Sequence, residues 1–396
     1  MINNRLIKLS DYPFDRLRNL LDRHNPSNEF EPISLAIGEP QHQPPKFVRK
    51  VINDSSQLWA KYPLVRGTPE FRNGVVGWIE QRYPASKGTV DPHKCVVPVS
   101  GTREALFMAA LAVIPEKING KTPAVLMPNP FYQVYIGAAA FAGAEAVLVN
   151  ANEKDRFLPN FREQPDEILD RTSFAYYCSP ANPQGTVASL EQLKDIILLA
   201  REHDFIIAFD ECYSEIYDIK APSGGIEACA ALGGSLKNVL VFNSLSKRSN
   251  VPGLRSGFVA GDPDLIAAFK RVRDYGGSPP PYPLLAAATA LWGDETHVEE
   301  NRKLYRSKFD AADQFLSGSY EYFRPPGGFY LWLNVHNGEK AAVKLWREGA
   351  LRTIPGRYLA KDDNNGNNPG APYIRCAMVH DIKTTVSALK RLKEIL

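Results

Sequence analysis

Seven short apolar runs between residues 96 and 260 limit the possible folds of this chain more than any other feature of its sequence. Turn residues bound each run, and segments of helical period lie between them, which is typical of parallel strands alternating with helices. The runs cover residues 96–99, 124–127, 146–149, 174–178, 205–209, 239–242 and 257–260. Helices are expected at 103–113 and 190–203, and Ser189 suits the N-terminus of the second. The pattern predicts an α/β protein with a doubly wound, mostly parallel seven-stranded sheet and helices on both faces.

A length of 396 residues exceeds what one hydrophobic core usually holds, so a large domain and a smaller one are expected. Residues 276–283 read GGSPPPYP, which can continue neither a helix nor a central strand, and we predict a domain boundary near them. Beyond this point, helical periods at 296–316 and 338–348 mix with strand-like runs at 328–334 and 373–378, which suggests an α+β domain. The predicted parts are an N-terminal arm with part of the small domain (1–44), a large domain (45–278) and a small C-terminal domain (279–396).

Charge and hydropathy give no indication of a nucleic-acid or membrane partner. The formal net charge is only +3, without a block of like charge. No apolar run is long enough to span a bilayer, and residues 1–10 lack the apolar stretch of an ordinary secretory signal. The five cysteines are scattered without metal-ligand spacing, so we expect reduced thiols in a cytoplasmic protein and no metal site. Residues 361–370, KDDNNGNNPG, are expected to form a solvated loop.

Polar and aromatic side chains follow several of the predicted strands at the point where each strand ends. In an open parallel sheet, ligands bind at the carboxyl ends of the strands. The residues concerned are Ser100 to Arg103 after the first run, Tyr132 after the second, Asn182 after 174–178, Asp210 after 205–209 and Asn243 to Lys247 after 239–242. Their common position predicts one active site at this edge of the sheet.

Residues 244–257 read SLSKRSNVPGLRSG, and they contain the residue types that a phosphate and an imine require. Ser244, Ser246 and Arg255 can donate hydrogen bonds to phosphate oxygens, Arg255 through a charged fork. Lys247 can form a Schiff base with an aldehyde. The alternative interpretation is an exposed lysine in a serine-rich loop.

This segment resembles the lysine signature of the class I/II aminotransferases, the fold-type I enzymes that depend on pyridoxal 5′-phosphate (PLP). The resemblance extends over nearly the whole chain. It includes Gly38-Glu39-Pro40, Tyr62 with Gly67-Thr68-Pro69, GTREAL at 101–106, SPANPQG at 179–185, Asp210 with Tyr213, PGGFY at 326–330, and Arg375. It implies a fold-type I PLP transferase whose cofactor is held as an imine on Lys247 and which moves amino groups between amino acids and keto acids.

The resemblance also implies roles for the residues around the cofactor ring. Asp210 would pair with the pyridine nitrogen, and Tyr213 and Asn182 would donate hydrogen bonds to the 3-oxygen of the ring. Tyr132 would stack on the ring face. Each residue has an ordinary alternative: Asp210 as a helix N-cap, Asn182 as a turn former and Tyr132 as part of the core.

The phosphate would be held by Ser244, Ser246 and Arg255 together with the backbone amides of three residues that begin a helix. These are Gly101, Thr102 and Arg103, for which a plain β-to-α turn is the alternative. In the family, Tyr62 reaches the phosphate from the neighbouring subunit, which implies a homodimer.

The substrate α-carboxylate would bind Arg375 as a bidentate pair, near Asn182 and a backbone group of Gly38. An ordinary surface arginine is the alternative for Arg375. Its apolar neighbours in YIRCAM favour a partly buried cation that needs a partner.

Within the family, the resemblance is greatest to the succinyldiaminopimelate aminotransferase group. It rests above all on residues 244–257, in which Arg248-Ser249-Asn250 is typical of that group, and also on Tyr12-Pro13-Phe14 and MPNPFYQ at 127–133. Ser256 stands where the wider superfamily has an aliphatic residue, but the serine is shared with the succinyldiaminopimelate group. It implies conversion of N-succinyl-LL-2,6-diaminopimelate and 2-oxoglutarate to N-succinyl-2-amino-6-oxopimelate and glutamate, in lysine biosynthesis. An aminotransferase for aspartate, alanine, aromatic amino acids or acetylornithine shares the same catalytic residues. A PLP β-lyase and a non-catalytic PLP-binding regulator are further alternatives.

Overall fold

The seven predicted runs are all strands of one sheet in the computed structural model, which describes residues 2–363 and 366–396. The strand order is β2-β8-β7-β6-β5-β3-β4. The strands are β2 (Val96–Val99), β3 (Ala124–Asn129), β4 (Glu145–Asn150), β5 (Thr172–Cys178), β6 (Ile206–Asp210), β7 (Val239–Ser244) and β8 (Gly257–Gly261). Strand β8 runs antiparallel to both of its neighbours, β2 and β7, and the other pairs of adjacent strands in the described sheet are parallel, so the prediction of a mostly parallel sheet is confirmed.

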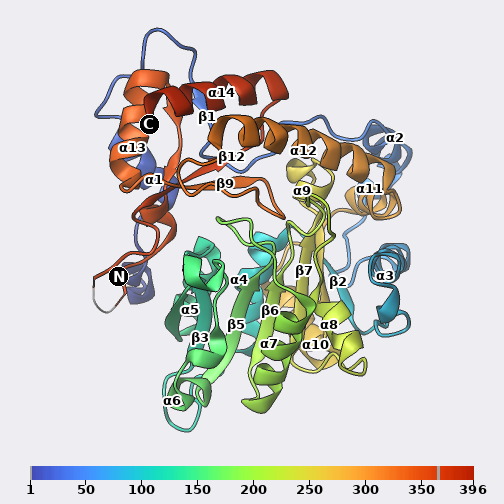
Figure 1. Ribbon diagram of the computed structural model, residues 1–396. Helices are drawn as coiled ribbons and strands as arrows, with labels where there is room; N and C mark the ends of the chain where they lie inside the picture. Colours follow the sequence, from blue (N-terminus) through green and yellow to red (C-terminus); the bar gives the residue numbers. More distant parts are fainter. Residues whose placement is uncertain (1, 364–365) are drawn as a thin grey trace.

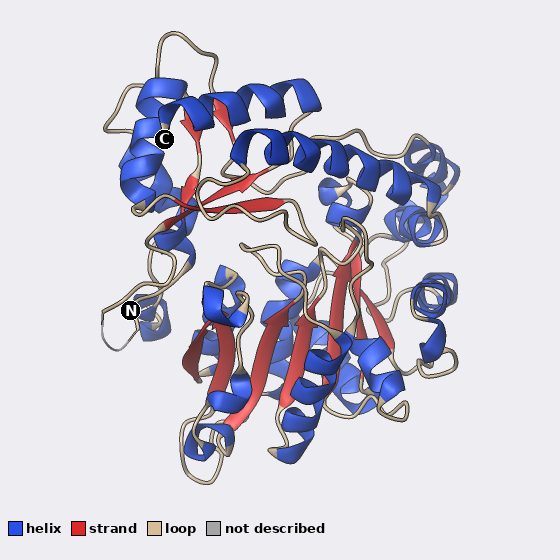
Figure 2. Ribbon diagram, viewed as in Figure 1, coloured by secondary structure: helices blue, strands red, loops and turns tan. Residues whose placement is uncertain are grey.

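Helices cover both faces of this sheet because successive strand residues point to opposite sides (Figure 2). In β5, Phe174 and Tyr176 belong to the apolar cluster on one face, and Ala175 and Tyr177 to the cluster on the other. The first face carries α4 (Thr102–Val113), α5 (Gln133–Ala142) and α10 (Pro263–Gly276). The second carries α3 (Pro69–Arg82), α7 (Leu190–Glu202), α8 (Gly225–Ala231) and α11 (Tyr282–Trp292). Ser189 caps α7 in a capping box with Gln192.

A second, three-stranded antiparallel sheet lies above the large sheet in Figure 1. Its order is β11 (Ile354–Pro355), β12 (Tyr373–Ala377) and β9 (Tyr330–Asn334). The helices of this part are α12 (Thr296–Leu316), α13 (Gly338–Gly349) and α14 (Ile382–Ile395). Their apolar faces pack with the strands in a separate core cluster.

The N-terminal segment packs with these C-terminal elements. Helix α1 (Pro13–Leu21) buries Leu17 and Leu21 in a cluster that contains Trp332 and Trp346. The short strand β1 (Ile33–Ser34) pairs with β10 (Leu351–Arg352) in parallel. Figure 1 shows the blue start of the chain among its orange and red end.

The proline-rich segment at 276–283 connects two helices that both pack with the large sheet. Helix α11 contacts α2 (Phe47–Asp54) and α3, and its apolar residues belong to the large-sheet core. The boundary predicted at residue 278 would instead assign α11 to the C-terminal domain, and the domain limits stay a prediction.

Three other sequence expectations concern the surface and the cysteines. Of the predicted solvated loop at 361–370, residues 364 and 365 lie outside the described residues, whereas Asn368 and Gly370 are buried rather than solvated. All five cysteines are free. In the described part of the chain, no helix is long and apolar enough to cross a membrane.

We expect Trp292→Ala in α11 to lower the free energy of unfolding by about 3–5 kcal/mol. The Trp292 ring is 2% exposed and lies 4.9 Å from Trp78 and 5.0 Å from Phe258, centroid to centroid, so truncation leaves a cavity in the large core. Urea denaturation followed by circular dichroism measures the loss. The control, Tyr275→Ala at a side chain that is 89% exposed, should change it by less than about 0.5 kcal/mol. Equal losses in both variants would contradict this account of the core.

Candidate active site

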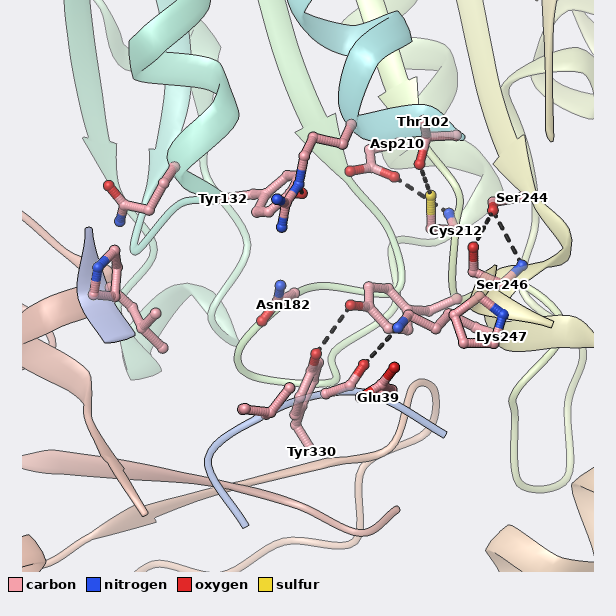
Figure 3. Close-up of a pocket in the computed structure, with 18 of the residues that line it drawn as sticks. Glu39, Thr102, Tyr132, Asn182, Asp210, Cys212, Ser244, Ser246, Lys247 and Tyr330 are labelled. Carbon is pink, nitrogen blue, oxygen red and sulfur yellow. Dashed lines mark hydrogen bonds between the residues drawn. The ribbon is translucent and has the colours of Figure 1, made fainter. Parts of the chain in front are cut away.

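A cavity of about 590 Å³ lies where the carboxyl ends of the large-sheet strands face the second sheet (Figure 3). All the predicted site residues line it except Gly101 and Tyr62. Those that do are Gly38, Thr102, Arg103, Tyr132, Asn182, Asp210, Tyr213, Ser244, Ser246, Lys247, Arg255 and Arg375. Gly101 packs against the guanidinium of Arg255, whereas Tyr62 is 99% exposed and lies outside the cavity.

Lys247 is held at the cavity by a short helix that follows directly after β7. This helix, α9 (Leu245–Arg248), begins at Ser244, whose hydroxyl accepts a hydrogen bond from the Ser246 amide. The Lys247 ammonium donates to the carbonyl of Gly38, where an added side chain would overlap the Tyr330 hydroxyl. Burial lowers the pKa of Lys247 to about 8, because desolvation disfavours the charged amine.

Asp210 ends β6 with its carboxyl group buried. One oxygen accepts from the Tyr135 hydroxyl at 2.6 Å, and the other accepts from the Cys212 amide at 3.3 Å. Burial raises the pKa of Asp210, while these hydrogen bonds oppose the rise. No cation of the described residues forms an ion pair with Asp210. A buried carboxylate without a counter-charge suits a ligand that brings a positive charge to it.

Beside the cavity, polar groups surround Gly101, a glycine with a positive φ. Gly101 has φ +94°, and a side chain there would overlap the guanidinium of Arg255. Arg255 donates to the carbonyls of Pro252 at 2.9 Å and Ser100 at 3.0 Å. Helix α4 begins at Thr102 without a capping side chain, so its first amides and the nearby guanidinium together suit an anion.

Arg375 of β12 approaches the cavity from the second sheet. The side chain is 4% exposed, and it donates to the Asn182 side-chain oxygen at 2.9 Å and to the Ala36 carbonyl at 2.7 Å. Its Nε is buried and has no hydrogen-bond partner among the described residues. The guanidinium lies 4.3 Å from the centroid of the Tyr330 ring. A carboxylate entering the cavity can therefore satisfy an arginine that the protein leaves incompletely bonded.

Four residues of this site were not singled out from the sequence as functional. Tyr135 donates to Asp210, Cys212 contacts the Thr102 hydroxyl at 2.9 Å, and the Tyr330 hydroxyl lies 3.0 Å from that of Tyr213. Asn301 of α12 donates to the backbone carbonyl of Lys247 at 3.1 Å. Tyr135 follows Tyr132 by three residues on one helix face, and Tyr330 ends the PGGFY motif, so both had a signal in the sequence. Asn301 had none, because it lies in no motif and follows no predicted strand of the large sheet.

The arrangement fits PLP at both ends. The Asp210 carboxylate, which has no ion-pair partner among the described residues, suits a protonated ring nitrogen. The groups around Gly101 suit a phosphate. Asn182 Nδ2 has no partner in the described part of the chain, so it is available to a ring oxygen. Tyr213 currently pairs with Tyr330, and Tyr132 lies beside Tyr135 with ring centroids 5.7 Å apart. Lys247 supplies the amine.

Comparisons with known proteins agree with this chemistry. A solved aminotransferase of Neisseria meningitidis superposes with a TM-score of 0.94, with 40% identity over 100% of both chains. The aminotransferase AspB of Helicobacter pylori gives 0.89, with 34% identity over 98% of both. An LL-diaminopimelate aminotransferase of Moorella thermoacetica is 29% identical, over 99% of this chain and 97% of that protein. The family model described as aminotransferase class I and II matches residues 31–392. The chain therefore belongs to the class I and II aminotransferases, PLP-dependent enzymes of the fold type that its sequence predicts.

Proposed function

We propose that this aminotransferase transfers an amino group from N-succinyl-LL-2,6-diaminopimelate to 2-oxoglutarate. The products are N-succinyl-2-amino-6-oxopimelate and glutamate, and the reaction belongs to lysine biosynthesis. One observation carries the proposal: motifs that resemble the succinyldiaminopimelate group line the cavity. They are Tyr12 to Phe14 and Phe131 to Gln133. Residues that contact a substrate, rather than the shared cofactor, are those expected to distinguish one member of the family from another.

A second candidate donor is LL-diaminopimelate itself. It is favoured by the name of the Moorella relative, which is similar over almost its full length. The two donors differ at the end remote from the reacting carbon. The free compound has a second ammonium group there, and the succinylated compound has an amide and a further carboxylate.

The residues divide the work of the reaction between them. Arg375 binds the α-carboxylate of the incoming amino acid and orients its α-carbon toward Lys247. Lys247 removes the proton from that carbon, and its depressed pKa keeps part of the amine neutral near pH 7. Asp210 would hold a proton on the cofactor ring nitrogen. Bound PLP supplies the electron-withdrawing ring that stabilises negative charge at the substrate α-carbon.

The proposed assembly is a homodimer in the cytoplasm. The almost complete exposure of Tyr62, outside its own cavity, supports a role for its hydroxyl in the site of a second copy. Five free cysteines support a reducing compartment.

The donor is identified by measuring glutamate formed from 2-oxoglutarate with N-succinyl-LL-2,6-diaminopimelate, LL-diaminopimelate or aspartate. We expect kcat/KM to be at least about tenfold higher for the succinylated donor, because one charge-assisted hydrogen bond is worth this factor. Lys247→Ala should form no glutamate with any donor. A preference for LL-diaminopimelate would establish the second candidate, and a preference for aspartate would contradict both.

The pKa of Lys247 predicts how fast the apoprotein reacts with PLP at different pH values. Only the neutral amine attacks the aldehyde, so the rate should rise about tenfold per pH unit below pH 8 and level off above it. Stopped-flow absorbance measures the rate, and mass spectrometry after borohydride reduction locates the label on Lys247. A rate that continued to rise to pH 10 would show an ordinary lysine, and Lys247→Ala provides the blank.

A further inference from the structure

Among the described residues, four cationic side chains line the cavity. Three of them have hydrogen-bond partners that suit the roles already described for them. Lys247 donates to Gly38, Arg255 donates to two carbonyls beside Gly101, and Arg375 donates to Asn182 and Ala36. Arg103 is the fourth cation. The backbone amide of Arg103 was expected at the cofactor phosphate, but its side chain has no assigned task.

The guanidinium of Arg103 forms a hydrogen bond through one of its three nitrogen atoms. Its Nε donates to the Tyr132 hydroxyl at 2.8 Å. It also lies 6.0 Å from the ring centroids of both Tyr12 and Tyr132. Within residues 2–363 and 366–396, no oxygen accepts from its two terminal NH₂ groups, and it forms no ion pair. Four N–H donors in a planar fork therefore remain free.

The position of Arg103 argues against a role in stabilising its own helix. Arg103 is the second residue of α4, where the positive end of the helix dipole disfavours a cation. The side chain is exposed and lines the cavity, so water solvates it until a ligand arrives. Arg103 is thus a cation at an unfavourable helix position, and only its Nε has a hydrogen-bond partner among the described residues. Such a guanidinium is suited to bind an anionic ligand.

We propose that the free edge of the Arg103 guanidinium binds the second carboxylate of dicarboxylic substrates, the one remote from the reacting carbon. Arg375 would bind the first carboxylate, and the two arginines would select amino and keto acids with an acid group at each end. The inference rests on the proposed function, since 2-oxoglutarate, glutamate and LL-diaminopimelate each have two carboxylates and the succinylated donor has three. It applies equally to any dicarboxylic substrate of this site.

Tyr132 acts in this arrangement as a positioning residue. Its hydroxyl accepts from Nε, which turns the two terminal NH₂ groups away from the tyrosine. Tyr132→Phe keeps the aromatic ring and removes the acceptor. We expect it to raise KM for 2-oxoglutarate more than it lowers kcat, because it disturbs recognition of the remote carboxylate rather than the reacting atoms.

The test compares ligands that differ in one carboxylate. Calorimetric titration of the PLP-loaded enzyme with glutarate and with pentanoate should show that the dicarboxylate binds about 10- to 100-fold more tightly. In Arg103→Gln this preference should disappear, and Arg103→Lys should retain only part of it. The ratio of kcat/KM for glutamate to that for norvaline should fall by the same factor. Arg16→Gln is the matched control, since Arg16 stacks on Tyr358 at 4.0 Å outside the cavity, and it should keep the preference.

Each possible outcome decides the question. The proposal is overturned if the wild-type enzyme binds glutarate and pentanoate equally tightly, or if the Arg103→Gln variant keeps the full preference for glutarate. It is also overturned if Arg103→Gln lowers the affinity for both acids by the same factor. If Arg103→Gln does not fold or retain PLP, then Arg103→Lys and Tyr132→Phe decide by the same ratio. This test uses glutarate and glutamate and no diaminopimelate compound. If neither diaminopimelate donor were a substrate, the proposed function would be contradicted, but this test would still decide the role of Arg103.

Discussion

The carboxyl group of Asp210 is buried at the end of β6 with two hydrogen-bond donors and no ion pair among the described residues. Such a group is costly unless a positive charge is placed against it, and none of the described residues supplies that charge. The rest of the site is arranged around this requirement. Tyr135 and Cys212 orient the carboxylate, and burial of Lys247 in the same cavity favours its reactive neutral form. A cationic ligand bound against Asp210 would therefore complete a charge balance that the described residues leave open.

One reversed strand explains how Arg255 comes to lie beside Gly101. Strand β8 lies between β2 and β7 and runs against both, so it starts at the edge where they finish. Gly257, its first residue, pairs with Val99 of β2 and with Ser244 of β7. Arg255, two residues earlier, therefore reaches the space beside Gly101. A purely parallel sheet would have placed this arginine at the opposite edge.

The strands and the residues at their ends could be predicted because they depend on local patterns. Apolar runs bounded by turn residues gave the seven strands, and strand direction brought Asp210 and Lys247 to one edge. The contacts that orient these residues could not be predicted in this way. Tyr135 meets Asp210 across 75 positions of sequence, and Asn301 meets Lys247 across 54. The core that α11 joins could not be predicted for a similar reason, since prolines mark a break in the chain without indicating where the next helix packs.

The start of the chain supplies part of the cavity wall. Tyr12 to Phe14 and Ile37 to Glu39 line the cavity, while β1 between them is hydrogen-bonded to β10 near the other end of the sequence. Residues 12–14 and 37–39 are thus part of the cavity lining. Deleting these residues to aid crystallisation, or fusing a bulky tag close to Tyr12, would alter the ligand-facing surface as directly as a substitution in the large sheet.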